Sequence, residues 1–356
     1  HYQIAYQIDM SVLAPVKGMR HILEKMERWN QAVAMLDIEA TLIAEKKRPA
    51  VYLRLGDIWK NKLQSPYQAL QYYNKVKQYG FNKPTEEKIL QLQEELEDFA
   101  GWVETQEKLI KNQPLDAPNL LPNLIKLGCI YWDKLHDANN AIKIFTIVLK
   151  QQKQNQTALH YLDEIFTETE QWPELVDVLI VLLETSQKDS EKYTYNKKLG
   201  DILYTKMHRG DRSSTYYEQA LTHTPEDLDL IHTLAQNYAE WGQYKKLIQI
   251  HQTELPLVKD KTLRTIQLYH EIADIWEKRL FDPEHAIATY YDLLEIYPKH
   301  QKTMERIAAV YRRQHQLPEL LEILEKIADY ASMQDDIDLE IQTKLEIGRL
   351  YKQQNQ

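Results

Sequence analysis

The sequence predicts an all-α protein, an α-solenoid in which antiparallel helix hairpins stack one on the next. Only 9 of the 356 residues are glycine, and residues that favour helices are abundant throughout the chain. We find no stretch with the two-residue alternation of apolar and polar side chains that is typical of a half-buried strand. A short motif also returns along the chain at a nearly constant interval, which indicates a repeat architecture.

The repeated motif pairs a bulky apolar residue with a small one, as in the segment Leu55-Gly56-Asp57-Ile58-Trp59. Its small residues are Gly56, Gly128, Gly200, Ala273 and Gly348, at intervals of 72, 72, 73 and 75 residues. A second motif lies between these, with bulky residues at Trp29, Phe99, Trp172, Tyr244 and Leu317, at intervals of 70, 73, 72 and 73 residues. Each repeat therefore contains two different half-repeats, and each half-repeat is long enough for two helices and a turn.

The two motifs predict a single solenoid over residues 1–356 with nine helix pairs. We expect these pairs at residues 15–45, 50–80, 84–113, 119–152, 155–187, 191–223, 227–257, 262–298 and 300–332. Residues 1–14 and 337–352 are expected to form a partial helix at each end. Because the array starts and stops inside a repeat, we expect the chain to be a fragment of a longer protein.

The recurring glycine predicts where helices approach one another. Glycine inside a helix costs roughly 1 kcal/mol relative to alanine, so its return at Gly56, Gly128 and Gly200 indicates that a neighbouring helix packs closely there. Paired bulky residues such as Tyr72-Tyr73 and Tyr290-Tyr291 follow in the next helix and are expected to fill the space between stacked hairpins.

The turns carry residues that start helices. Ser65, Asp137 and Asp282 are N-cap types, each nine residues after its small residue. Proline is favoured at the first helical position, which we predict for Pro66, Pro283, Pro173 and Pro318. The segment 208–211 departs from this pattern, and we predict a shifted turn there.

These residues resemble the tetratricopeptide repeat family, as a tandem array with about 72 residues in each double repeat. The family pattern has a bulky residue, Leu-Gly, an aromatic, then Ala, an aromatic and Pro. One half-repeat matches it with Leu55, Gly56, Trp59, Ala69 and Tyr72, and another with Ile272, Ala273, Trp276, Ala286, Tyr290 and Pro298. The first half-repeat has one extra residue in its turn, and the second has Leu90 and Asp163 where the family prefers Gly or Ala.

The resemblance also implies where a partner binds. In this family the first helix of each pair lines a concave groove. Transferred to this chain, the groove positions are Asp57, Lys60, Asn61, His160, Glu164, Lys197, Asp201, Tyr204, His232, Gln236, Glu240, His270, Asp274 and Glu277. Acidic residues among them favour a protein or peptide partner with basic residues. The alternative that these side chains are ordinary solvated helix faces stays open.

Composition narrows the function further. The chain has 44 basic and 53 acidic side chains, a balance that argues against a nucleic-acid backbone as partner. Cys129 is the only cysteine, so an internal disulfide and a cysteine-based zinc site are excluded. No run of about 18 apolar residues occurs, so we expect no membrane insertion, and we expect a cytoplasmic location.

The sequence contains no motif for catalysis. It has no Gly-rich phosphate loop, no HExxH and no Gly-x-Ser-x-Gly. The pairs His160/Glu164 and His270/Asp274 have a spacing that can share a metal ion, which is also the spacing of ordinary surface pairs on helices. We therefore expect no enzyme, no catalytic residue, no metal and no cofactor.

The predicted function is a protein–protein interaction scaffold, or adaptor, within a multiprotein complex. A non-catalytic arm that positions substrates for a larger enzyme is the first alternative. A helical-repeat RNA-binding protein is the second, and it would require basic residues clustered on the first helices. Self-association of the array stays open.

Overall fold

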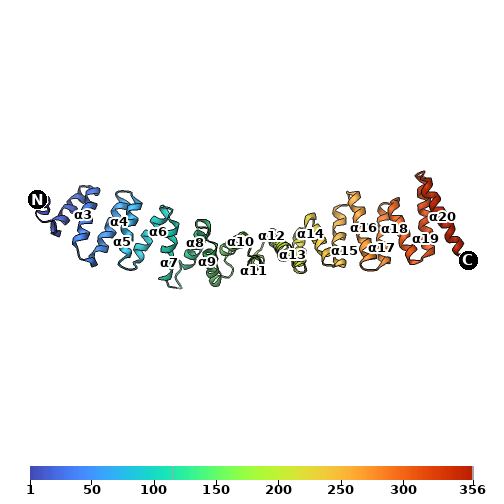
Figure 1. Cartoon of the computed structure of the whole chain (residues 1–356), viewed down its shortest axis with the longest axis horizontal. Helices are drawn as coiled ribbons and strands as arrows, with labels where there is room; N and C mark the ends of the chain where they lie inside the picture. Colours follow the sequence, from blue (N-terminus) through green and yellow to red (C-terminus); the bar gives the residue numbers. More distant parts are fainter. Residues whose placement is uncertain (115, 355–356) are drawn as a thin grey trace. The chain divides into compact units, whose positions relative to one another are not determined.

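The computed structural model describes residues 1–114 and 116–354, and every regular element in these ranges is a helix, with no strand. The predicted all-α fold class is therefore confirmed. The contacts divide the chain into two compact units, unit 1 (His1–Leu182) and unit 2 (Leu183–Gln356). We describe each unit by itself, with the helix labels of Figure 1.

Unit 1 begins with a short helix and continues as hairpins. Its helices are α1 (Tyr2–Ile8), α2 (Leu13–Lys25), α3 (Trp29–Leu42), the 3₁₀ turn η1 (Glu45–Lys47), α4 (Arg48–Asn61), α5 (Pro66–Lys77), α6 (Lys83–Glu95), α7 (Phe99–Lys111), α8 (Leu120–Asp133), α9 (Ala138–Gln151), α10 (Gln156–Glu168) and most of α11 (Trp172–Thr185).

Unit 2 repeats this order. Its helices are α12 (Asp189–Asp201), the π-helical turn η2 (Ile202–Lys206), α13 (Gly210–His223), α14 (Leu228–Glu240), α15 (Tyr244–Glu254), the 3₁₀ turn η3 (Leu255–Leu257), α16 (Thr262–Lys278), α17 (Pro283–Ile296), α18 (Gln301–Gln314), α19 (Leu317–Met333) and α20 (Ile337–Gln354). We call the even-numbered helices from α2 onward the first helices of their hairpins, and the odd-numbered ones from α3 onward the second helices.

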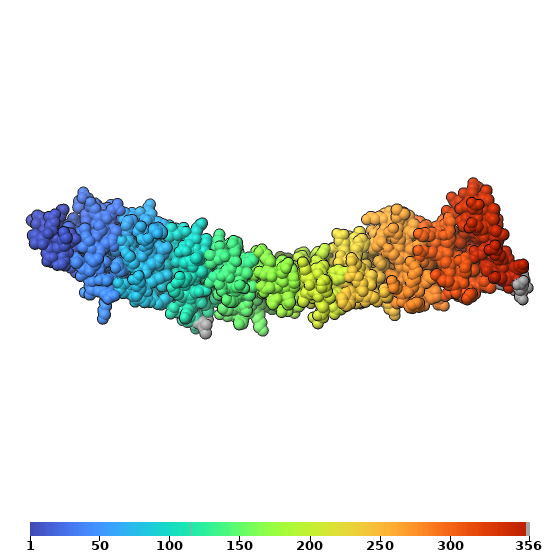
Figure 2. Space-filling model, in the orientation of Figure 1, coloured from blue at the N-terminus to red at the C-terminus, as the bar shows by residue number. Residues whose placement is uncertain are grey.

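Packing within each unit is local. The main contacts join consecutive helices, and α8 also contacts α10. In the space-filling view the colours within one unit accordingly follow one another without mixing (Figure 2). Each hairpin cannot bury its apolar face alone, so the core is a series of layers between neighbours, as in other repeat proteins.

The recurring glycines lie where the next helix brings a ring. A Cβ atom added to Gly56 would come within 2.3 Å of the Tyr73 ring, and the ring of Tyr217 is 2.4 Å from the corresponding point on Gly200. Both tyrosine side chains are fully buried. The prediction of close helix approach at these glycines is therefore confirmed. Gly348 differs, because nothing lies within 4 Å of its Cβ position.

The turns between first and second helices share one backbone form. A residue with positive φ lies eight positions after each small residue, namely Gln64, His136, His208 and Phe281. The turn at residues 208–211 is therefore in register, and the prediction that it is shifted is wrong. What differs is the end of the preceding helix, where Ile202–Lys206 adopts π-helical geometry, and the N-cap, where Arg209 makes no side-chain cap bond.

The caps follow the sequence only in part. Asp137 accepts a hydrogen bond from the Asn140 amide at 3.0 Å, and Asp282 accepts one from the His285 amide at 3.1 Å. Ser65 is the N-cap of α5 but makes no such bond. The prediction for the prolines holds for Pro66 and Pro283, which are first in their helices, whereas Pro173 and Pro318 are second.

Candidate partner-binding surface

The residues that the resemblance assigns to a groove all lie on first helices or their continuation. In unit 1 these are Asp57, Lys60 and Asn61 on α4, and His160 and Glu164 on α10. In unit 2 they are Lys197 and Asp201 on α12, Tyr204 in η2, His232, Gln236 and Glu240 on α14, and His270, Asp274 and Glu277 on α16. The structure shows which of these side chains are held by neighbours.

Three of the carboxylates are paired with the ring that packs on the small residue before them. The Tyr73 hydroxyl donates to Asp57 at 2.6 Å, and the Tyr217 hydroxyl donates to Asp201 at 2.8 Å. In the Ala273 repeat the Tyr290 hydroxyl lies 3.4 Å from Asp274. Burial, and secondly the bond to the carboxylate, raises the pKa of Tyr73 and of Tyr217, so both hydroxyls stay protonated and donate.

The Gly128 repeat lacks both members of this pair. Phe145 occupies the place of the tyrosine, and Cys129 occupies the place of the aspartate. Tyr161, from the next first helix, stacks on Phe145 with the ring centroids 5.0 Å apart. The hydroxyl and the carboxylate are thus absent together, as expected if each needs the other as a hydrogen-bond partner in this packed site.

Two of the three carboxylates also receive a cation from the following first helix. Lys88 Nζ lies 2.5 Å from Asp57, and Arg306 donates to Asp274 at 2.6 Å. Lys278 adds a second cation to Asp274 at 3.0 Å. Lys88, Tyr161, Thr233 and Arg306 share one repeat position, because each lies 11 residues before the bulky residue of the second motif. Beside Asp201, that position holds the neutral Thr233.

Other bonds also join neighbouring first helices. In unit 1, Lys60 donates to Gln91 at 3.3 Å, Lys126 to Glu94 at 2.8 Å, and the Trp132 indole to Glu164 at 3.1 Å. In unit 2, Tyr204 donates to Glu240 at 2.6 Å, Lys197 lies 3.7 Å from Asp227, and Arg313 pairs with Glu277. Gln236 donates to Glu240 within α14 at 2.9 Å, whereas Asn61 and His160 are exposed. Most of the predicted groove residues therefore hold the row of first helices together.

His232 belongs to a buried polar cluster that the sequence analysis missed. Its Nε2 lies 2.9 Å from Glu254, whose side chain is fully buried and also accepts two bonds from Arg264, at 2.8 and 3.0 Å. Burial alone would raise the pKa of Glu254, but the hydrogen bonds from Arg264 and His232 outweigh it and hold the pKa below its usual range. The available signal was an acidic residue at the place where Leu182 and Ile327 stand in other repeats.

His270 is half-buried and neutral. Its Nε2 lies 2.8 Å from the Thr303 hydroxyl, and its ring meets the edge of Tyr290 at a centroid distance of 5.6 Å. Burial lowers the pKa of His270 to about 4, so the ring carries no charge near neutral pH. Of the two histidine–carboxylate pairs with metal-sharing spacing, this one is occupied by contacts within the fold. In residues 1–114 and 116–354 no group of three or more His, Cys, Asp or Glu side chains could hold a metal ion.

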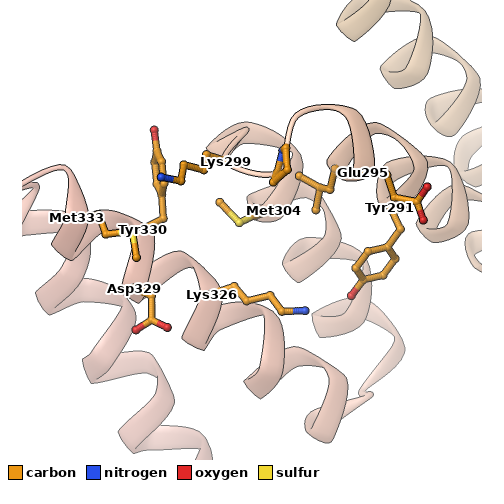
Figure 3. A pocket seen from close by; sticks show the side chains of 10 residues that line it. Tyr291, Glu295, Lys299, Met304, Lys326, Asp329, Tyr330 and Met333 are labelled. Atoms are coloured by element: carbon orange, nitrogen blue, oxygen red, sulfur yellow. The ribbon is translucent and has the colours of Figure 1, made fainter.

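A cavity of about 490 Å³ lies away from the predicted groove, among α17, α18 and α19 (Figure 3). Met304 lies at its centre, with Tyr291 and Tyr330 on opposite sides. The corresponding gap of unit 1 is closed, because Lys77 reaches across it to Thr105 and Glu86, at 3.2 and 3.5 Å. Leu294 replaces that lysine in unit 2 and is too short and apolar to make the same bridge.

Comparisons with known proteins give distant similarities. No family model matches the chain. Superkiller protein 3 of Schizosaccharomyces pombe is 25% identical over 200 residues, which cover 55% of this chain and 14% of that protein. The chain thus spans a small part of the relative that it matches.

Solved structures are similar over more of the chain but at lower identity. A chain of Naa15/Naa10 bound to HypK-THB is 14% identical, with a TM-score of 0.41, covering 96% of this chain and 64% of that chain. A tetratricopeptide repeat protein from Parabacteroides merdae is 15% identical, with a TM-score of 0.32, covering 74% and 98% of the two chains. Separately, none of the described helices is long and apolar enough to cross a membrane.

Proposed function

We propose that this chain is a tetratricopeptide-type repeat module that binds other proteins along the row of first helices. The observation that carries the proposal is the way side chains join each first helix to the next. In unit 1 this series runs from α4 to α6 through Asp57 and Lys88, and from α6 to α8 through Glu94 and Lys126. A continuous face of this kind lets one extended polypeptide contact several hairpins at once.

The charge of this face supports a partner with basic residues. On α12 and α14, Asp201 and Glu240 are exposed carboxylates whose hydrogen bonds come from neutral tyrosine or glutamine side chains. On α16, by contrast, Asp274 and Glu277 already pair with Arg306 and Arg313. The part of unit 2 around α12 and α14 is therefore where we expect a basic segment to bind.

Site-specific photo-crosslinking tests the proposal. A photoreactive amino acid is placed at His160 or Gln236, which are exposed on first helices, and at Lys143 or Gln249, which are exposed on second helices and serve as matched controls. We expect crosslinked products from the first-helix positions, with little product from the controls. Equal labelling from both faces would contradict binding along the first helices.

The same experiment separates protein from RNA. Crosslinked products are treated with protease or with nuclease after capture of the chain under denaturing conditions. Products that change mass only after nuclease treatment would favour the RNA-binding alternative. Identification of the crosslinked polypeptide by mass spectrometry then names the partner, and its segment can be checked for basic residues.

A further inference from the structure

We propose that a lysine or arginine side chain of the bound polypeptide occupies the position beside Asp201 that basic side chains of the chain itself occupy in other repeats. The inference rests on the proposed function and adds the chemistry of one contact. It comes from comparing four copies of the same site within the chain, built on Gly56, Gly128, Gly200 and Ala273.

Two copies show what this site binds. In the first, the Asp57 carboxylate receives the Tyr73 hydroxyl at 2.6 Å and Lys88 Nζ at 2.5 Å. In the fourth, Asp274 receives Arg306 at 2.6 Å, and the same guanidinium nitrogen lies 3.3 Å from the Tyr290 hydroxyl. The carboxylate and the tyrosine hydroxyl together therefore form a site that accepts either an ammonium or a guanidinium group.

The second copy shows how the chain dispenses with the cation. Cys129 and Phe145 replace the carboxylate and the hydroxyl, and Tyr161 covers the ring by stacking. The hairpin packs in this copy without any charge, so the aspartate is not needed to hold the hairpin together. A copy that keeps both polar groups without a cation of its own therefore keeps the means to bind one.

The third copy is of this kind. Asp201 accepts the Tyr217 hydroxyl at 2.8 Å and is exposed, and the position of Lys88 and Arg306 holds Thr233. Thr233 donates its own hydroxyl to the Asp229 carbonyl. Within the described residues of unit 2, no lysine or arginine forms an ion pair with Asp201.

Nearby charges favour a cation at this place. Asp227 and Glu240 lie on the neighbouring helix α14 or at its N-cap, and Lys197, one turn before Asp201, is directed to Asp227 at 3.7 Å and to the Tyr193 hydroxyl at 3.3 Å. Carboxylates therefore outnumber the cation among these groups. An incoming basic side chain would meet an exposed carboxylate and a phenolic oxygen in the arrangement that Arg306 meets in the fourth copy.

Supplying the cation within the chain gives the first test. The variant Thr233→Arg restores the residue type of the fourth copy, and Thr233→Gln is the uncharged control. We expect Thr233→Arg to raise the midpoint of thermal unfolding by about 2 °C relative to Thr233→Gln, as an exposed ion pair does in a unit of this size. The gain should disappear when Asp201→Asn is added. A gain that persists in the Asp201→Asn background, or no gain at all, would overturn the assignment.

Binding of a small cation gives the second test. N-acetyl-arginine amide is titrated into the full chain and followed by amide chemical shifts, with N-acetyl-citrulline amide as the neutral isostere. We expect saturable shifts at α12 and α14 from the arginine compound only, about fivefold weaker in Asp201→Asn and in Thr233→Arg. Shifts of equal size from citrulline, or arginine binding that is unchanged in Asp201→Asn, would overturn the proposal.

The two levels of the proposal fail in different ways. If the crosslinking experiment finds no polypeptide on the first helices while arginine binds at Asp201, the proposed function fails and the cation site stands. If a polypeptide crosslinks at Gln236 while neither cation test depends on Asp201, the proposed function stands and this inference fails.

Discussion

Replacing Gly200 with alanine tests whether ring packing on the small residue holds each hairpin together. A Cβ atom on Gly200 would lie 2.4 Å from the ring of Tyr217, and this ring is fully buried, so it cannot swing out into solvent. Gly348 is the matched control, because it lies in a first helix of the same unit and a Cβ there meets nothing within 4 Å. Both variants gain the same helix propensity of roughly 1 kcal/mol.

The difference between the two variants isolates the cost of crowding. Overpacking a filled core costs about 1–3 kcal/mol, so Gly200→Ala should be less stable than Gly348→Ala by about this amount. The Ala273 repeat shows how the fold relaxes when alanine is present. There Tyr290 stays buried, but its hydroxyl lies 3.4 Å from Asp274, compared with 2.8 Å for Tyr217 and Asp201. We therefore expect Gly200→Ala to weaken the bond to Asp201 as well.

Urea unfolding combined with native-state hydrogen exchange is the appropriate assay. Repeat arrays do not always unfold as a single two-state unit, so the exchange rates of α12 and α13 are needed beside the global midpoint. Faster exchange in these two helices should accompany the loss of stability in Gly200→Ala. A Gly200→Ala variant as stable as Gly348→Ala, with unchanged exchange in α12 and α13, would refute the reasoning.

Three further predictions concern the caps, the ring pairs and the effect of pH. Asp282→Ala should cost about 1 kcal/mol of unfolding free energy, while Ser65→Ala should change it little because Ser65 makes no cap bond, as urea midpoints would show. Tyr73→Phe should cost about 1 kcal/mol by removing the hydrogen bond to Asp57, and an unchanged urea midpoint would contradict the assigned bond. Burial lowers the pKa of His251 to about 4, so the unfolded chain takes up the proton first as the pH falls below about 6.5. Stability is therefore complete above that pH and decreases toward pH 4, and His251→Phe should flatten the dependence measured between pH 7 and pH 5.

The fold could be predicted because its signals are local and periodic. The glycine inside each first helix and the ring 17 residues later appear together in three repeats, and the structure places each ring on its glycine. Asp137 and Asp282 could be assigned as caps because the bond they make is to an amide three residues away. The π-helical turn at Ile202–Lys206 could not be predicted, because the residue spacing across it is the same as in the other repeats.

The partner-binding residues could be placed on first helices but not ranked. Asp57, Asp201 and Asp274 have the same position in the repeat, yet two of them hold a cation and one does not. The predicted site residue His232 is bonded to a buried glutamate that the periodic pattern would assign to a leucine. Among the predicted groove residues, the structure therefore directs attention to the exposed carboxylate of Asp201.

The sequence by itself determined the helix hairpins, their order and the points where they approach, because these depend on residues within about one half-repeat of each other. Only the tertiary structure decided which polar groups are already satisfied and which face solvent. The partner of Asp57 is a residue on the next first helix, Lys88, and the partner of Asp274 is Arg306. Whether such a pair forms depends on stacking, since stacking brings side chains from successive first helices within hydrogen-bond distance.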